Sequence, residues 1–237
     1  MDAAANGFKA ARLYRLGGMA LVIAAVLQVT GFALHPAGEQ LSHVDQPLYG
    51  PAHVVMFVSW VLVMAGLPAV YARIADRAGT LGVVAFLSSL VAIAYHCYLT
   101  LYEGFAVGVM AANEGARSLL GPDGPLAHGA GALGIVAMAS LLAFPLLGIA
   151  ILRSGSFPRT SGWLLVAALP GFAVGMIAAG MFGGPIGPEA DNWFSGMLPV
   201  TTLYTLAFAG YAVAGNRLRA EASTGTRAVA SGRAVSV

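Results

Sequence analysis

Residues 78–102 read AGTLGVVAFLSSLVAIAYHCYLTLY and contain no charged side chain. A helix needs about 20 apolar residues to cross the roughly 30 Å hydrocarbon core of a bilayer. This run is therefore long enough to form a transmembrane helix. Its few polar side chains become informative once the rest of the chain is read in the same way.

Five further uncharged runs divide the remainder of the chain. They cover 16–38, 46–72, 124–152, 160–188 and 192–216, each at least 23 residues long. None shows the strict alternation over about ten residues that is typical of a membrane β-strand. The sequence predicts an all-α integral membrane protein, a bundle of six transmembrane helices with spans at about 16–35, 51–72, 79–103, 128–152, 161–183 and 193–215.

The composition indicates that lipid surrounds most of the chain. Hydrophobic residues make up 58% of the 237 residues and charged residues only 9%, whereas soluble domains carry about 25% charged residues. The net charge of +2 and the lack of a basic stripe argue against nucleic acid as a partner. The richness in Arg, Ala, Gly and Val favours a bacterial source with a GC-rich genome.

Basic residues predict the orientation in the membrane. Six spans place both termini on one side, and eleven of the twelve basic residues then lie there: Lys9, Arg12, Arg15, Arg73, Arg77, Arg153, Arg159, Arg217, Arg219, Arg227 and Arg233. Because basic residues concentrate on the cytoplasmic side, we expect both termini inside and a multi-pass protein of the bacterial plasma membrane. The predicted parts are a cytoplasmic segment 1–15, a transmembrane domain 16–216 and a disordered cytoplasmic tail 217–237.

All five histidines are predicted to lie in the outer half of the molecule. They are His35, His43, His53, His96 and His128. The single cysteine, Cys97, excludes an intrachain disulfide and a CxxC motif. Imidazoles gathered at one depth of a membrane protein make that half the expected place of a functional site.

The span at 79–103 carries one polar stripe. Ser89, His96 and Glu103 follow one another at intervals of seven residues, and Thr100 lies between the last two. Residues three, four and seven apart share a helix face, and ionisable residues within a span normally face the bundle interior or a water-filled cavity. The stripe predicts a substrate or proton pathway. The alternative is that His96 only bonds a neighbouring helix and specifies packing.

The other histidines favour a cofactor hypothesis. His53 and His128 each lie in the first turn of a span that enters from outside, so they should lie at similar depth. Such a pair can bind the iron of haem b, with His53, His96 and His128 as the candidate cofactor ligands. With His96 and Glu103 the pair can instead hold a divalent metal such as zinc. Against both ideas, no local motif such as HExxH is present, and an imidazole at the membrane surface can simply face water.

The sequence thus predicts an outer-face His/carboxylate site for redox or metal-dependent chemistry, with no catalytic residue indicated. One alternative is a small-solute or proton-coupled transporter or binding protein. Another is an accessory subunit of a larger membrane complex, or a homo-oligomer. Two GxxxG pairs, Gly104–Gly108 and Gly171–Gly175, favour close helix packing in any of these cases.

Overall fold

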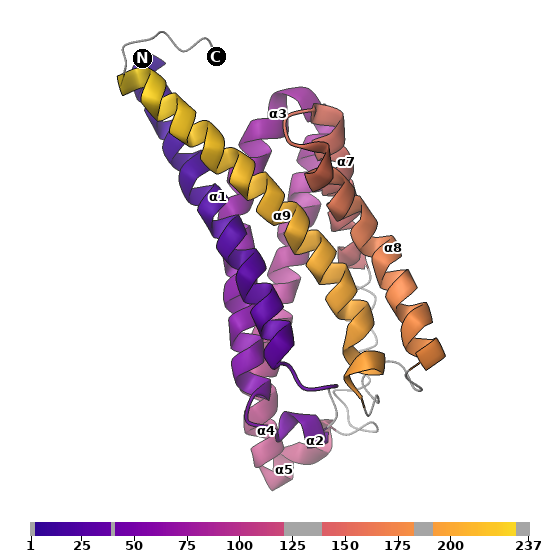
Figure 1. Cartoon of the computed structure of the whole chain (residues 1–237). Coiled ribbons are helices and arrows are strands. Elements are labelled where there is room, and N and C mark those ends of the chain that lie inside the picture. Colours follow the sequence, from indigo (N-terminus) through magenta and orange to yellow (C-terminus); the bar gives the residue numbers. More distant parts are fainter. Residues whose placement is uncertain (1–2, 39–40, 121–138, 183–191, 231–237) are drawn as a thin grey trace.

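The computed structural model describes residues 3–38, 41–120, 139–182 and 192–230, and these ranges contain helices and no strands, which agrees with the predicted all-α fold (Figure 1). The longer elements are α1 (Ala3–Leu34), α3 (Tyr49–Leu101), α7 (Ala143–Ser154), α8 (Arg159–Phe182) and α9 (Trp193–Ala230). The shorter elements are α2 (Leu41–Val44), the π-helix η1 (Tyr102–Val107), α4 (Gly108–Ala112), α5 (Glu114–Arg117) and the 3-10 helix η2 (Ser118–Leu120).

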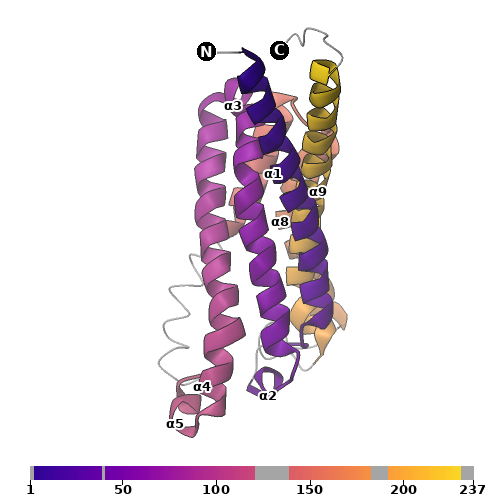
Figure 2. The ribbon, with the colours of Figure 1, turned by 90° about the vertical axis from the view of Figure 1, so that its left-hand side faces the viewer.

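Element α3 consists of two limbs that run in opposite directions, 49–78 and 80–101 (Figure 2). The reversal occurs at Gly79, whose backbone angles are φ 56° and ψ −142°. A side chain is strongly disfavoured in this region, which glycine enters readily. One residue therefore replaces a loop between two long apolar helices.

Four helices in the described ranges are long and apolar enough to cross a membrane: Ala10–Leu34, Tyr49–Ala112, Arg159–Met181 and Ser195–Thr224. The second of these contains both limbs of α3 and so covers the predicted spans 51–72 and 79–103. The predicted span 128–152 is described only from residue 139 onward, where Ala139–Ser154 forms a shorter apolar helix.

Large apolar side chains point away from the bundle along several helices. Val91, Val109, Ile177 and Met181 are 67, 72, 63 and 71% exposed. Water disfavours apolar side chains that are exposed to this extent, whereas lipid accommodates them. This surface is compatible with a bilayer environment.

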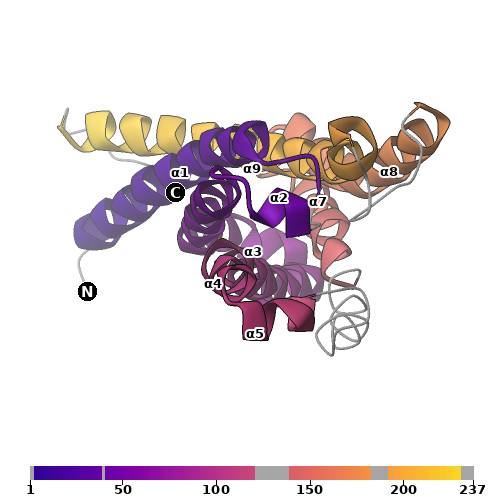
Figure 3. The ribbon, with the colours of Figure 1, turned by 90° about the horizontal axis from the view of Figure 1, so that it is seen from below.

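The five long elements form a closed ring of contacts. In order around the ring, α3 packs on α1, α1 on α9, α9 on α8, α8 on α7 and α7 on α3 (Figure 3). The interior contains the fully buried side chains of Trp60, Phe144 and Phe208. Both ends of the chain thus belong to the same bundle.

Glycines set the closest approaches between helices. A Cβ built on Gly18 would lie 2.5 Å from the carbonyl oxygen of Gly215, and one on Gly215 would lie 2.6 Å from that of Gly18. Gly148 and Gly162 make the equivalent contact between α7 and α8, at 2.6 and 2.9 Å. Small residues of this kind let membrane helices gain van der Waals contact, since apolar burial gives little driving force in lipid.

The two predicted GxxxG pairs behave differently. Gly171 and Gly175 both face α9, where added Cβ atoms would lie 2.6 Å from Leu206 Cδ1 and 2.7 Å from the backbone. Gly104 packs against the first limb of α3, while an added Cβ on Gly108 meets nothing within 4 Å. Close packing therefore involves both Gly171 and Gly175, but only Gly104 of the other pair.

The connections separate into two ends. One end of the bundle contains the start of α1, the bend within α3, the α7–α8 connection and the end of α9. The other end contains α2, α4 and α5 (Figures 1 and 2). At the second end Arg117 donates hydrogen bonds to both oxygens of Asp45, at 3.2 and 2.8 Å. This guanidinium lowers the pKa of the Asp45 carboxyl below its ordinary value.

The helix α9 continues well past the predicted end of the last span. Where the sequence predicts a disordered tail from residue 217, the structure continues α9 as a helix to Ala230. Leu218 and Ala222 are buried, and Arg73 donates two hydrogen bonds to Glu221, at 2.8 and 3.1 Å. Residues 231–237 lie outside the described ranges. At the other terminus α1 already begins at Ala3, within the predicted segment 1–15.

Candidate functional site

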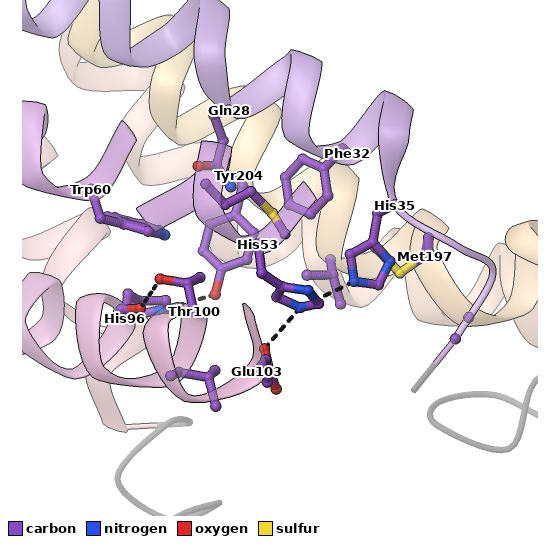
Figure 4. A pocket seen from close by; sticks show the side chains of 15 residues that line it. Gln28, Phe32, His35, His53, Trp60, His96, Thr100, Glu103, Met197 and Tyr204 are labelled. Atoms are coloured by element: carbon purple, nitrogen blue, oxygen red, sulfur yellow. Dashed lines mark hydrogen bonds and ion pairs between the residues drawn. The ribbon is translucent and has the colours of Figure 1, made fainter. Parts of the chain in front are cut away.

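A cavity of about 220 Å³ lies among α1, both limbs of α3, η1 and α9, in the half of the bundle nearer α2 and α5 (Figure 4). Three features of its wall bear on function: a cluster of ionisable side chains, a buried amide and a set of aromatic rings. The lining residues are Gln28, Phe32, His35, Gly38, His53, Met56, Trp60, His96, Leu99, Thr100, Glu103, Gly196, Met197, Val200 and Tyr204.

The polar wall of the cavity is arranged in two tiers. Each contributing segment supplies two lining residues that are seven positions apart. This interval is two helical turns or about 10 Å along a helix, and it places both residues on one face. The deep tier consists of Gln28, Trp60, His96 and Tyr204. The end tier, nearer α2 and α5, consists of His35, His53, Glu103 and Met197.

Three ionisable side chains of the end tier contact one another. His53 Nε2 lies 3.0 Å from Glu103 Oε2 and 3.2 Å from His35 Nε2, and Figure 4 shows the three side chains in a row. His53 Nδ1 donates to the carbonyl oxygen of Tyr49 at 2.9 Å. His35 Nδ1 donates to the carbonyl oxygen of Pro36 at 2.7 Å. The backbone thereby fixes the tautomer of each ring.

These tautomers imply a shared proton. Because each Nδ1 carries the ring hydrogen, the Nε2 atom of a neutral ring has only a lone pair, and an ionised carboxylate oxygen also carries no hydrogen. The contacts among His35 Nε2, His53 Nε2 and Glu103 Oε2 therefore need at least one additional proton, held by an imidazole or by the carboxyl. The cluster thus brings together three groups that can each hold a proton.

Local backbone features bring Glu103 to this position. It lies in the π-helix η1, which follows α3 directly, and single π-turns within α-helices occur frequently at functional sites. The next residue is Gly104, where an added Cβ would lie 3.1 Å from His53 Cβ and 3.4 Å from the carbonyl oxygen of Gly50. The missing side chain lets η1 approach the first limb of α3.

The histidine of the deep tier has a different environment. His96 Nδ1 donates to the carbonyl oxygen of Ala92 at 2.7 Å, so Nε2 accepts the hydrogen bond from the Tyr204 hydroxyl at 2.6 Å. The ring is 3% exposed and stacks on Trp60, with centroids 4.4 Å apart and planes at 29°. Both partners suit a neutral imidazole, and the Tyr204 bond joins the second limb of α3 to α9.

Gln28 brings a buried amide to the deep tier. Its side chain projects from α1 toward the space beside Trp60 and Tyr204 (Figure 4) and is 1% exposed. Among the described residues its Oε1 atom finds no hydrogen-bond donor. The deep tier therefore presents a hydrogen-bond acceptor to the cavity.

Between the tiers the wall is mostly apolar, apart from Thr100. Phe32, Met56 and Val200 line this part of the cavity, and Phe32 stacks on Tyr204 with centroids 5.7 Å apart and planes at 17°. The cavity thus has an apolar middle and polar groups toward both tiers. This is the usual composition of small-molecule sites.

The predicted polar stripe is divided by the structure. His96, Thr100 and Glu103 line the cavity, but Ser89 does not belong to the described lining. Ser89 instead donates to the carbonyl oxygen of Ala85 at 2.7 Å, a bond within its own helix. His43 is buried in α2 and is also not part of the described lining.

The metal and haem predictions find no support in the described residues. Within the ranges 3–38, 41–120, 139–182 and 192–230, no group of three or more His, Cys, Asp or Glu side chains is arranged to hold a metal ion. The haem hypothesis pairs His53 with His128, which lies outside the described residues. His96, the third predicted ligand, bonds Ala92 and Tyr204 instead.

Sequence reasoning did not select Gln28, and it did not predict the direct contact of His35 with His53. The interval of seven residues that relates His96 to Glu103 also relates Gln28 to His35, so the same search on the first span would have found Gln28. The pairing of His35 with His53 depends on how two helices are rotated toward each other. No periodicity in one helix contains that information.

Comparisons of the chain with protein families, with curated proteins and with solved structures found no match. The cavity and its two tiers are therefore the basis for an assignment of function.

Proposed function

We propose that the protein binds a small solute in this cavity and couples binding to the proton held by His35, His53 and Glu103. The observation that supports the proposal is that this proton-binding cluster forms part of the cavity wall. The solute and the proton would then occupy adjacent places.

The size of the cavity limits the solute. A volume of about 220 Å³ is below the roughly 300–1,000 Å³ of sites for drug-sized ligands. It exceeds the roughly 150 Å³ of an engineered apolar cavity that takes up benzene. A molecule of about one ring with one or two substituents fits between these limits.

The coupling follows from thermodynamic linkage. A solute group beside Glu103 and His53 interacts differently with the cluster when a proton is added or removed. Any factor by which the solute changes proton binding is matched by an equal factor by which the proton changes solute binding. Solute affinity should therefore depend on pH on the side to which the end tier opens.

We also propose six membrane passes with both termini in the cytoplasm of a bacterial cell. In this arrangement each limb of α3 crosses the membrane once, and the shorter helix Ala139–Ser154 belongs to a further pass. The end of the bundle that contains the basic residues of α1, α9 and the Gly79 bend is cytoplasmic by the positive-inside rule. The end tier then lies in the outer half of the membrane.

The packing favours a protein that transports the small solute as a carrier. Phe144 and Phe208 pack on Trp60 of the deep tier, and these buried rings close the bundle at the inner end of the cavity. A cavity near one face with a closed path to the other is what a transporter requires in one of its states. The proton cluster would supply the coupling ion.

The proposal can be tested by proton counting on the purified full chain in lipid nanodiscs. Phenol, benzoate and benzylamine are added in weakly buffered solution with a pH-sensitive dye. We expect at least one probe to bind with uptake or release of protons, and we expect Glu103→Gln to abolish the proton change. Glu114→Gln, an exposed acid on α5 at the same end, is the matched control and should behave as wild type. Binding of no probe, or an unchanged proton count in Glu103→Gln, would contradict the proposal.

A further inference from the structure

The burial of the Gln28 amide is energetically unfavourable. Its side chain is almost completely buried in the deep tier, beside Trp60, His96 and Tyr204. A buried carbonyl oxygen without a donor is destabilising, and native structures rarely leave one unpaired. A leucine would fill the same space without that cost, so the amide indicates a partner that the described residues do not supply.

Three polar neighbours of Gln28 already use their hydrogens elsewhere. The Tyr204 hydroxyl donates to His96 Nε2, and the Thr100 hydroxyl donates to the carbonyl oxygen of His96. The remaining hydrogen of that imidazole goes to Ala92. These three donors are therefore committed, which leaves the acceptor of Gln28 for a bound molecule.

The surrounding rings indicate the shape of that molecule. Trp60 lies at 82° to Tyr204, with centroids 5.5 Å apart, while Phe32 and Tyr204 are nearly parallel. Met56 and Val200 complete the apolar part of the wall. Aromatic walls in offset and edge-to-face arrangements favour a flat apolar guest.

We infer that the solute is a single-ring, largely apolar molecule that carries an O–H or N–H group and donates this hydrogen to Gln28 Oε1. The inference rests on the proposed function and specifies its substrate class. Phenols and aromatic amines have this chemistry. The ring lies between Phe32 and Trp60, and its donor reaches the deep tier while any second substituent points to His53 and Glu103.

The test compares three probes of one ring that differ in the donor. Phenol has an O–H, anisole keeps the oxygen without the hydrogen, and toluene has neither. Their dissociation constants are measured by calorimetry on the full chain in nanodiscs, with empty nanodiscs to subtract partition into lipid. One hydrogen bond in a desolvated site corresponds to about a tenfold difference, so we expect phenol to bind about tenfold more tightly than anisole.

Two variants locate the hydrogen bond. Gln28→Leu keeps the approximate volume and removes the acceptor, so the phenol-to-anisole ratio should fall to about one while toluene still binds. Thr201→Val is the matched control, because Thr201 Oγ1 is also buried without a partner among the described residues but is not in the described lining. This variant should keep the wild-type ratio.

The outcomes separate the two levels of the proposal. If none of the three probes binds wild type, the proposed function itself is contradicted. If all three bind with similar affinity, or if Gln28→Leu keeps the preference for phenol, the cavity stands and the inference about the donor is overturned. Should Gln28→Leu not fold, the ratio measured on wild type still decides the matter.

Discussion

His53 and His96 are both buried imidazoles on α3, yet their neighbours give them different chemistry. His96 has a carbonyl oxygen and a tyrosine hydroxyl as partners, which together satisfy a neutral ring. His53 has a carbonyl oxygen, a carboxylate and a second imidazole, and this set requires an extra proton. At the residue scale, the deep tier thus contains a histidine with the partners of a neutral ring, and the end tier contains the histidine for which we propose proton binding.

The hydrogen bond between His96 and Tyr204 should contribute measurably to stability. We expect Tyr204→Phe to lower the free energy of unfolding by about 1 kcal/mol, the scale of hydrogen bonds between membrane helices. The reason is that His96 Nε2 remains buried without its donor. SDS titration in mixed micelles measures this quantity. Tyr98→Phe, whose side chain is half exposed, should have no effect, and an equal loss in both variants would refute the role of this bond.

The sequence could predict part of this site and not the rest. The seven-residue interval places His96 and Glu103 on one helix face, because helical geometry alone decides that. The Tyr204 partner of His96 is 108 positions away, and it depends on the rotation of α9 about its own axis. The sequence leaves open whether His96 has a packing or a functional role, and the structure shows only that His96 and Glu103, at different places on the stripe, have different partners.

At the scale of the element, the reversal within α3 determines how the tiers align. Gly79 turns the chain without a loop, so the two limbs lie side by side along their length (Figure 2). His53 and Glu103 consequently meet at one level, and Trp60 and His96 at another. Charge patterns predict where these spans end, but they contain no information on the conformation of the residue between them.

Substitution at Gly79 should separate backbone strain from crowding. An added Cβ meets nothing within 4 Å at either Gly79 or Gly108, but only Gly79 has a positive φ, 56°. We expect Gly79→Ala to destabilise the protein by about 1–3 kcal/mol and Gly108→Ala to be neutral or stabilising by up to about 1 kcal/mol. Unfolding in mixed micelles measures both. Equal effects would show that the conformation of Gly79 is not required.

The end of α9 illustrates why a tail can be misjudged from composition. Residues 217–230 contain charged and small residues and no apolar run, which predicts disorder for a segment alone in water. In the structure, α1 extends past the apolar region at the same end, and Arg73 reaches Glu221 from α3. The segment is helical because these neighbours exist, and no local pattern shows them.

At the scale of the whole molecule, the cavity is formed by segments far apart in the chain. Residues 28–38, 53–60, 96–103 and 196–204 all contribute to its wall. The all-helical architecture was predictable from runs without charge, because lipid requires them. The cavity was not, since its shape depends on which apolar faces meet and on glycine contacts such as Gly18 with Gly215.

The proposed orientation can be measured by thiol accessibility. In a Cys97→Ala background, Glu114→Cys and Ser223→Cys each place one exposed thiol at an opposite end of the bundle. We expect a membrane-impermeant maleimide to label Glu114→Cys in intact spheroplasts and Ser223→Cys only after lysis. This follows from the concentration of basic residues on the cytoplasmic side. Labelling in the reverse order would overturn the orientation.

The central claim is that His35, His53 and Glu103 share a proton at the cavity wall. Nitrogen-15 NMR of histidine-labelled protein in lipid bilayers at neutral pH tests it most directly, with His35→Gln and His53→Gln to assign the signals. The account predicts that Nδ1 is protonated in both rings. It also predicts that His53 Nε2 carries or shares a hydrogen, and that the signal of this nitrogen changes in Glu103→Gln. The account would be contradicted if the signal shows His53 Nε2 without a bound hydrogen and does not change in Glu103→Gln.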